Sequence, residues 1–248
     1  MAQPGYLLFS DVLAGEIEKL VPPSPVTVFR KPSNASNGLA IDPDGLLIAC
    51  EGDAHRVTRT LSNGTIDPIA TTYGGKSLNS PNDVISAADG TIYFTDPDLG
   101  RTNPNDKQPF SSVFRLGTDK SLALVSSDMQ SPNGIALSPD GKALYVGDSA
   151  QNYLRRYALH PDGSAGPPTK LADTAPMPDG FSVDDLGRLY VATLAGIQIF
   201  TSDGALQGTI AVPEQPSNCA FGGADRRTLY ITARTSLYQV RVATPGKP

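Results

Sequence analysis

The sequence is poor in several residue types that mark particular classes of protein. It has no tryptophan, two histidines and two cysteines in 248 residues. Cys50 and Cys219 lie far apart, which argues against a disulfide framework and predicts two buried free thiols. No segment approaches the ~20 consecutive apolar residues that span a bilayer, so we expect no membrane partner. Residues 1–9 lack the basic and apolar regions of a secretory signal, which makes the cytoplasm the expected compartment.

Clusters of basic residues are missing as well. The formal net charge is -5, and the densest basic groups are the pairs Arg155-Arg156 and Arg226-Arg227. A nucleic-acid-binding face needs clustered Lys and Arg, so we expect no nucleic-acid partner. The sequence also has no Gly-x-Ser-x-Gly elbow, Cys-x-x-Cys pair or phosphate-binding loop.

A repeated unit accounts for most of the chain. Each copy begins with an Asn or Asp, often after Pro, and continues as an apolar strand, a tight turn, usually Asp-Gly, and a second apolar strand. The copies begin at Asn37, Asn82, Asn133, Asp179 and Asn218, at spacings of 45, 51, 46 and 39 residues. Repeats of ~40–50 residues with about four strands are typical of propeller blades.

We therefore predict an all-β fold, a six-bladed β-propeller that forms one domain over residues 1–248. The five copies supply five blades, and the first segment supplies a sixth, with residues 6–11 as its second strand and 16–20 as its third. No innermost strand is expected before Tyr6, so the first blade is predicted to be incomplete. Its exposed strand edge could then lead to self-association. A solenoid is the rival architecture, but its repeats are mostly shorter.

The first residues of the innermost strands should form a ring around the propeller axis. All innermost strands begin at the same end of a propeller, so the ring should contain the five residues that open the repeats. Five such side chains would be costly to leave dry and unpaired. A hard divalent cation such as Ca²⁺ accepts carboxylate, amide and water oxygens. For any single copy, the alternative is that Asn or Asp simply favours a turn.

Residues at the ends of the second strands should approach the same site. This set of acids is Asp11, Glu51, Asp96 and Asp148, and of these we predict a substrate contact for Asp96. His55 lies between the second and third strands of its blade, on the same end, and is a further candidate for contact with a ligand. His160 lies in an outer turn and is expected at the surface.

On these motifs the chain resembles the SMP-30/gluconolactonase/luciferin-regenerating family. The resemblance covers nearly the whole chain and is most specific in residues 80–97, 131–148, 178–200 and 219–238. It implies a six-bladed propeller and a lactonase that depends on a divalent metal ion, with Ca²⁺ favoured over Zn²⁺. Asn133 and Asp179 match metal ligands of the family, and Asn82 matches a residue that touches the metal or the substrate.

The sequence also differs from the family pattern in one segment. The family's metal-binding Glu lies in a Glu-Gly-Pro segment ahead of the position of Gly5, and the sequence begins too late to contain it. Asp179 is therefore expected to be the only carboxylate in the ring, which should weaken cation binding.

The leading functional hypothesis is a metal-dependent hydrolase of a small-molecule lactone. The cation would polarise the lactone carbonyl, Asp179 or a water held by it would act as base, and Asn82, Asp96, Asn37 and His55 would contact the substrate. The metal ligands would be Asn133, Asp179 and Asn82. One alternative is a catalytically weak or inactive propeller that binds a small molecule or a protein on the same face. Another is a metal-independent propeller of the strictosidine-synthase type.

Overall fold

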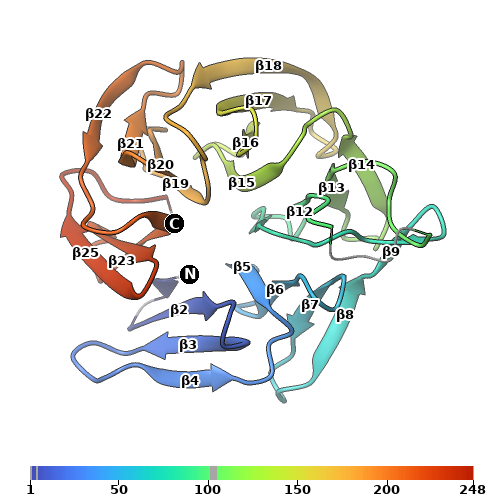
Figure 1. Cartoon of the computed structure of the whole chain (residues 1–248), viewed down its shortest axis with the longest axis horizontal. Helices are drawn as coiled ribbons and strands as arrows, with labels where there is room; N and C mark the ends of the chain where they lie inside the picture. The colour runs from blue at the N-terminus through green and yellow to red at the C-terminus, as the bar shows by residue number, and fades with distance from the viewer. Residues whose placement is uncertain (1, 4, 101–104, 248) are drawn as a thin grey trace.

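The protein is a β-propeller of six blades. The computed structural model describes residues 2–3, 5–100 and 105–247. Six antiparallel sheets surround a central axis, and a small hairpin, β9 (Thr72–Tyr73) and β10 (Lys76–Ser77), lies beside them (Figure 1). The predicted all-β, six-bladed fold is thus confirmed. The described residues form no helix long and apolar enough to cross a membrane.

In each blade the strands follow one another outward from the axis in chain order. The first three blades consist of β1 (Ala2–Gln3), β2 (Tyr6–Asp11), β3 (Glu16–Leu20) and β4 (Thr27–Arg30); β5 (Ser36–Ile41), β6 (Leu47–Glu51), β7 (Arg56–Thr60) and β8 (Ile66–Ala70); and β11 (Val84–Ser86), β12 (Ile92–Asp96), β13 (Ser112–Leu116) and β14 (Leu122–Ser126). The last three consist of β15 (Pro132–Leu137), β16 (Ala143–Asp148), β17 (Tyr153–Leu159) and β18 (Ala165–Asp173); β19 (Phe181–Val183), β20 (Leu189–Thr193), β21 (Gly196–Phe200) and β22 (Leu206–Ile210); and β23 (Pro216–Gly222), β24 (Thr228–Ala233) and β25 (Ser236–Arg241).

Tight turns join the first and second strands of the second to fifth blades. The turn between β15 and β16 contains Gly141 at φ 68°, a backbone conformation that glycine adopts at little cost. The side chain of Asp140 accepts hydrogen bonds from Ser138 Oγ (2.6 Å) and from the N–H of Lys142 (3.1 Å). Asp-Gly pairs that stand between two apolar strands, such as Asp140-Gly141, therefore mark hairpins.

The first blade has a short innermost strand, which corrects the expectation that no strand precedes Tyr6. Strand β1 pairs with β2 through Ala2 opposite Leu7 and Gln3 opposite Tyr6. Among the described residues the ladder stops there, so the innermost strand of this blade is much shorter than β2. Phe9 and Ser10 of β2 are among the residues that line the cavity at the axis.

Five clusters of buried apolar side chains join consecutive blades. Between the second and third blades, for example, Ile48 and Val57 pack with Phe94 and Phe114. The ring centroids of the two phenylalanines lie 5.3 Å apart. Within the described residues, no such cluster joins the last blade (β23–β25) to the first (β1–β4). We call the border between these two blades the sixth interface.

Both cysteines belong to these cores, as predicted. Cys50 lies in the cluster between the second and third blades and Cys219 in the cluster between the fifth and the last. Both are buried free thiols, and burial raises the pKa of Cys219 to about 12. The two cysteines therefore act as small apolar core residues.

Candidate functional site

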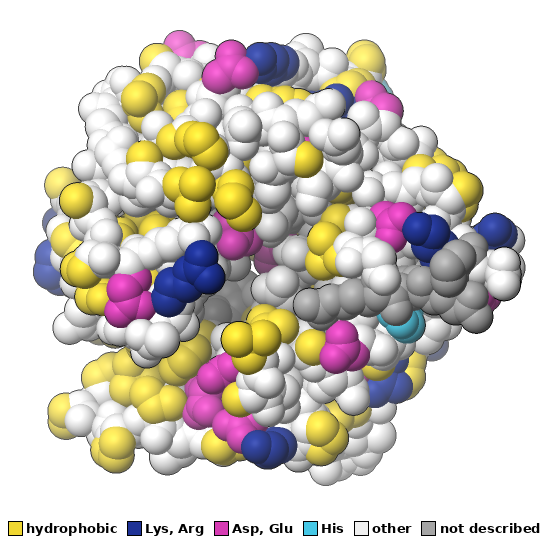
Figure 2. Space-filling view, viewed as in Figure 1, with side chains coloured by type: hydrophobic (Ala, Val, Ile, Leu, Met, Phe, Trp, Pro, Cys, Tyr) yellow, Lys and Arg dark blue, Asp and Glu magenta, His cyan; other side chains and the backbone are white. Residues whose placement is uncertain are grey.

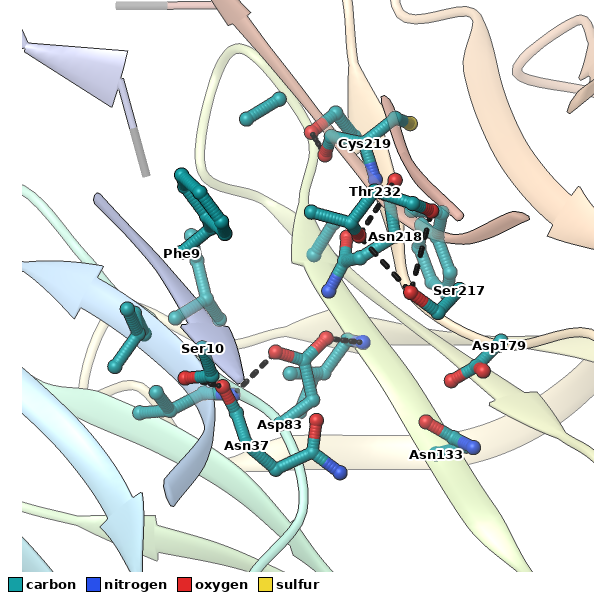
Figure 3. Close-up of a pocket in the computed structure, with 18 of the residues that line it drawn as sticks. Phe9, Ser10, Asn37, Asp83, Asn133, Asp179, Ser217, Asn218, Cys219 and Thr232 are labelled. Atoms are coloured by element: carbon teal, nitrogen blue, oxygen red, sulfur yellow. Dashed lines mark hydrogen bonds between the residues drawn. The ribbon is translucent and has the colours of Figure 1, made fainter. Parts of the chain in front are cut away.

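A cavity of about 700 Å³ lies at the propeller axis. Its polar end is lined by the residues at the starts of the innermost strands, namely Asn37, Asn82, Asp83, Asn133, Asp179, Ser217 and Asn218. Figure 3 shows Asn133 and Asp179 side by side. Asp83 lies between this pair and Ser10 of β2. The structure thus brings together four of the predicted site residues: Asn37, Asn82, Asn133 and Asp179.

Irregular pairing at the starts of the innermost strands directs these side chains. In the third blade the N–H of Asn82 donates to the carbonyl of Thr95 (2.8 Å), while the N–H of Thr95 donates to the carbonyl of Asp83 (3.0 Å). Two residues therefore face one on the neighbouring strand, the arrangement of a β-bulge. The fifth blade has the same arrangement at Asp179, opposite Ala192. Bulges re-aim side chains and are frequent next to active sites.

Close contact between neighbouring blades explains why glycine follows several ring residues. The N–H of Gly38 donates to the carbonyl of Asn82 in the next blade at 2.6 Å. A Cβ atom on Gly134 would lie 2.2 Å from the carbonyl oxygen of Asp179. The Asn-Gly and Asp-Gly pairs at the ring therefore reflect the approach of two backbones, whereas the sequence alone also allowed an ordinary turn.

The last blade corrects the predicted ring by one residue. Gly180 donates its N–H to the carbonyl of Ser217 (2.8 Å), as Gly38 does to Asn82. Ser217 also follows a proline, Pro216, just as Asn82 follows Pro81. Ser217 therefore occupies the ring position, and Asn218 is the residue after it, although both line the cavity.

Asp179 is the carboxylate whose environment at the ring is most perturbed. Its burial raises its pKa to about 7, and the nearby charge of Asp83 acts in the same direction. Hydrogen bonds from the Asn133 amide and the Gly180 N–H oppose this shift. A carboxyl group that titrates near neutrality can exchange protons with a bound ligand or water.

Asp83 is a second carboxylate at the cavity, which corrects the expectation that Asp179 is the only one. One of its oxygens accepts from the N–H of Val84 (2.9 Å) and the other from the N–H of Ile135 (3.1 Å). Burial raises its pKa to about 6, against the effect of these two bonds. The sequence carried a signal for Asp83. Asn37 and Asn133 are each followed by glycine, whereas Asn82 is followed by Asp83.

The amide of Asn133 is held in place by its neighbours. Its Nδ2 donates to Ser149 Oγ (3.0 Å), and Ser149 Oγ donates to the carbonyl of Pro178 (2.6 Å). Because the amide nitrogen is engaged in this way, the amide oxygen is the atom suited to contact a cation or a donor in the cavity.

The donor set at the ring suits a hard cation. Two carboxylates, Asp83 and Asp179, face a cavity whose only basic lining residue within the described chain is Lys247. The backbone of Lys247 bonds to Val183, four residues beyond Asp179 along β19, which places it toward the other end of the channel. No three His, Cys, Asp or Glu side chains in the described residues are grouped to hold a metal ion. A cation here would therefore need amide oxygens, and oxygen ligands favour Ca²⁺ over Zn²⁺.

Asp96 and His55 are not among the residues that line the cavity. The carboxylate of Asp96 is buried and accepts from the N–H groups of Asn79 and Ser80, both at 2.8 Å. The Nδ1 of His55 donates to the carbonyl of Asn79. These contacts give both residues a role in shaping the chain ahead of Asn82, and their contact with substrate stays a prediction.

The other second-strand acids also bind the local backbone or side chains. Glu51 is fully buried between Arg30 and Arg56, at 2.9 and 2.8 Å. Asp148 accepts from four backbone N–H groups, including those of Gln130 (2.7 Å) and Ser131 (3.2 Å). These acids hold the loops at the site end of the propeller.

Comparison with known proteins places the chain among lactonase-like propellers. The family model of the SMP-30/Gluconolactonase/LRE-like region matches residues 1–235. Gluconolactonase from Zymomonas mobilis is 34% identical over an alignment that covers 97% of this chain and 76% of that protein. Pentonolactonase XacC from Haloferax volcanii is 25% identical, with coverage of 98% and 88%.

Solved structures agree with this relationship. A gluconolactonase from Xanthomonas campestris has a TM-score of 0.86 and 33% identity, covering 97% of this chain and 82% of that one. Regucalcin from Agrobacterium tumefaciens, a calcium-binding protein, has a TM-score of 0.78 at 21% identity, covering 94% and 79%. At that lower identity the likeness concerns the fold alone.

Proposed function

Because the chain belongs to the SMP-30/gluconolactonase/LRE-like family, we propose that its axial ring hydrolyses a lactone. The observation that carries this proposal is the position of Asp179, a carboxyl group with a pKa near 7 beside Asn133 at the polar end of the cavity. The names of two relatives, a gluconolactonase and a pentonolactonase, support the same reaction class.

A divalent cation fits the ring and would be held by Asn133, Asp179 and Asn82. When bound, it would supply Lewis-acid polarisation of the lactone carbonyl and stabilise the negative charge that develops on its oxygen. Calcium is favoured because all of these donors are oxygens.

The side chains at the ring have separate roles in the proposed reaction. Asp179, or a water held by it, accepts a proton from the attacking water, whose oxygen forms the new bond to the carbonyl carbon. The ester bond within the lactone ring then breaks, and the ring oxygen takes up a proton to leave a hydroxy acid. Asn82 and Asn37 orient the lactone by hydrogen bonds at the mouth of the ring.

A second candidate function is a propeller that binds a small molecule or a protein on this face without catalysis. The observation that favours it is the composition of the ring. It has two carboxylates, and one of them, Asp83, already accepts two backbone N–H groups. Weak cation binding would leave the cavity as a binding site only.

Hydrolysis assays of two Asp→Asn variants would separate the two candidates. We expect Asp179→Asn to lower kcat/KM by about 10²–10⁴-fold with the fold intact, because the variant loses the proposed base. Asp184→Asn is the matched control, because Asp184 is also a buried carboxylate and does not line the cavity.

The control variant should keep the activity of the folded protein. Equal rates for wild type and Asp179→Asn would place the chemistry elsewhere. Absence of hydrolysis with any lactone in wild type would favour the binding propeller.

A further inference from the structure

We propose that the protein has a second binding site, separate from the axial ring, for the carboxylate group of a small organic acid. The site is a groove between the fourth blade (β15–β18) and the fifth (β19–β22), which are neighbours in Figure 1. Tyr145 and Arg156 bind the carboxylate oxygens. Neither is among the described residues that line the axial cavity, so the proposal does not depend on the lactonase function.

The groove lies at the end of the propeller opposite the ring. Strands β15 and β19 run away from the ring, and the turns that follow them line the groove together with parts of β17, β18 and the turn between β21 and β22. The volume of the groove is about 650 Å³. This size is within the range of small-molecule sites.

A Tyr–Arg pair in the third blade shows what such a pair can bind. Tyr93 of β12 lies opposite Arg115 of β13. The Tyr93 hydroxyl donates to the carbonyl of Gly163 (2.6 Å), and Arg115 Nη2 donates to the carbonyl of Asp162 (2.5 Å). Both carbonyls belong to the turn between β17 and β18. The outer turn of the fourth blade thus supplies two acceptor oxygens to the pair in the third.

The fourth blade contains the same pair without these acceptors. Tyr145 of β16 lies opposite Arg156 of β17. Directly opposite residues of an antiparallel pair share a face, and both side chains line the groove. Tyr145 is only 2% exposed. Among the described residues, neither its hydroxyl nor the Arg156 guanidinium has a hydrogen-bond partner, so both donors are available to a ligand.

The turn that could supply the acceptors packs elsewhere. In the turn between β21 and β22, the first N–H donates to the carbonyl of the fifth residue at 2.9 Å, as in the turn between β17 and β18. A Cβ on Gly163 would lie 3.0 Å from the Tyr93 hydroxyl. A Cβ on the matching Gly204 would instead lie 2.1 Å from the carbonyl oxygen of Leu171. The fifth-blade turn therefore packs on the backbone of β18, which leaves the groove open.

The acidic side chains of the groove already have partners. Each of the three bonds to a nearby side chain: Asp140 to Ser138, Asp185 to Arg226, and Asp203 to Thr201. Of the three basic lining residues, Lys170 pairs with Asp173 (2.5 Å). Figure 2 shows basic and acidic side chains next to each other over β18, the strand of this pair, at the top of the view. Lys142 and Arg156 have no ion-pair partner in the described parts of the chain.

The charges and shape of the groove favour a carboxylate. The formal charges of its three basic and three acidic lining residues cancel, which suits a singly charged group better than phosphate. A guanidinium fork matches the two oxygens of a carboxylate. Leu186, which is 70% exposed, and Pro139 also line the groove and can contact a short hydrocarbon chain.

Calorimetry with sodium butyrate at constant ionic strength tests the site. We expect one saturable binding event in wild type, weakened about tenfold or more in Arg156→Gln and several-fold in Tyr145→Phe. The matched controls are Arg115→Gln and Tyr93→Phe, which change the closed pair and should bind as wild type does. Absence of binding in wild type, or equal affinity in both groove variants, would overturn the proposal. Tighter binding of phosphate than of butyrate would overturn the choice of carboxylate.

Thermal unfolding compares the two tyrosine hydroxyls directly. Without ligand, Tyr93→Phe should lower the melting temperature by about 2–4 °C, because it loses a hydrogen bond within the protein. Tyr145→Phe should change the melting temperature much less. Equal losses would show that the Tyr145 hydroxyl is bonded within the protein and would contradict the proposal.

Lactone hydrolysis by Arg156→Gln separates this site from the ring. The variant should hydrolyse lactones as wild type does, because Arg156 lies at the other end of the propeller. Butyrate binding at the groove together with no hydrolysis in wild type would refute the proposed function and keep this inference. Hydrolysis in wild type without butyrate binding would refute this inference alone.

Discussion

Five interfaces between blades are closed by apolar cores, whereas the sixth contains part of the cavity. Between the second and third blades, Phe114 is fully buried, with its ring centroid 5.0 Å from that of Tyr73. At the sixth interface, Phe9 and Leu237 are only partly buried and line the cavity. Both regions are built from strands of antiparallel sheets. We infer that the five closed interfaces carry most of the stability.

Removing one aromatic ring from each region should give the largest contrast. Phe114→Ala should lower the free energy of unfolding by about 3–5 kcal/mol, because it leaves a cavity in a packed core. Phe9→Ala should cost about 1 kcal/mol or less, since its ring already borders open space. Urea unfolding of both variants and wild type measures the two losses. Similar losses would mean that the sixth interface is packed as tightly as the others.

Alanine substitutions at Gly134 and Gly180 test how closely the backbones of neighbouring blades approach each other at the ring. Gly134→Ala should cost about 2–3 kcal/mol, because its Cβ would meet the backbone oxygen of Asp179 at 2.2 Å. At Gly180 the obstacle is the side chain of Asn218, which borders the cavity and has room to move. Gly180→Ala should therefore cost less when both are measured by thermal unfolding.

A rescue variant provides the control for this pair. Asn218→Gly removes the obstacle at Gly180 and should restore the stability lost in Gly180→Ala. It should leave the loss in Gly134→Ala unchanged. A failure of rescue would show that the main-chain contacts around Gly180 are as rigid as those around Gly134.

The smallest contrast concerns pH and Asp96, a buried carboxylate that does not line the cavity. Burial raises the pKa of Asp96 to about 7, above the ordinary value of 3.8, while the N–H groups of Asn79 and Ser80 oppose the shift. Between these two pKa values the folded protein binds a proton more readily than the unfolded chain does. This contribution to stability is therefore fully present below the ordinary pKa of 3.8 and is lost as the pH rises through about 7.

Chemical unfolding from pH 5 to pH 8 in the presence of a chelator tests this contribution. Wild type should lose stability over this range relative to Asp96→Asn, which has no carboxyl group to titrate there. The variant should also be less stable overall, because one amide oxygen replaces two acceptors. Parallel pH profiles for the two proteins would show that Asp96 titrates alike in the folded and unfolded chains.

The repeat made the fold and most of the ring predictable. Asp-Gly turns and alternating strands are local signals, so they could be counted along the chain. Asn82, Asn133 and Asp179 follow a proline in one register, which was enough to place them at the axis. In the last blade the sequence prediction differs from the structure by one residue, because Asn218 carries an amide like the other ring residues, whereas Ser217 has the preceding proline.

Other features depend on contacts that no short segment of sequence encodes. The sixth interface joins residues near the start of the chain, such as Phe9, to residues near its end, such as Leu237. The direction of Asp96, away from the cavity and toward backbone N–H groups, depends on how the loop before Asn82 folds. Asp83 could have been identified from the sequence, because Asn37, Asn133 and Asp179 are each followed by glycine, whereas Asn82 is followed by a carboxylate.

Titration of chelator-treated protein with Ca²⁺ by calorimetry tests most directly the claim that the ring is a functional cation site. The account predicts one binding event in wild type that is lost in Asp179→Asn and kept in Asp96→Asn, because Asp179 lines the cavity and Asp96 does not. Absence of heat in wild type at millimolar Ca²⁺ would contradict the account, as would equal binding by Asp179→Asn.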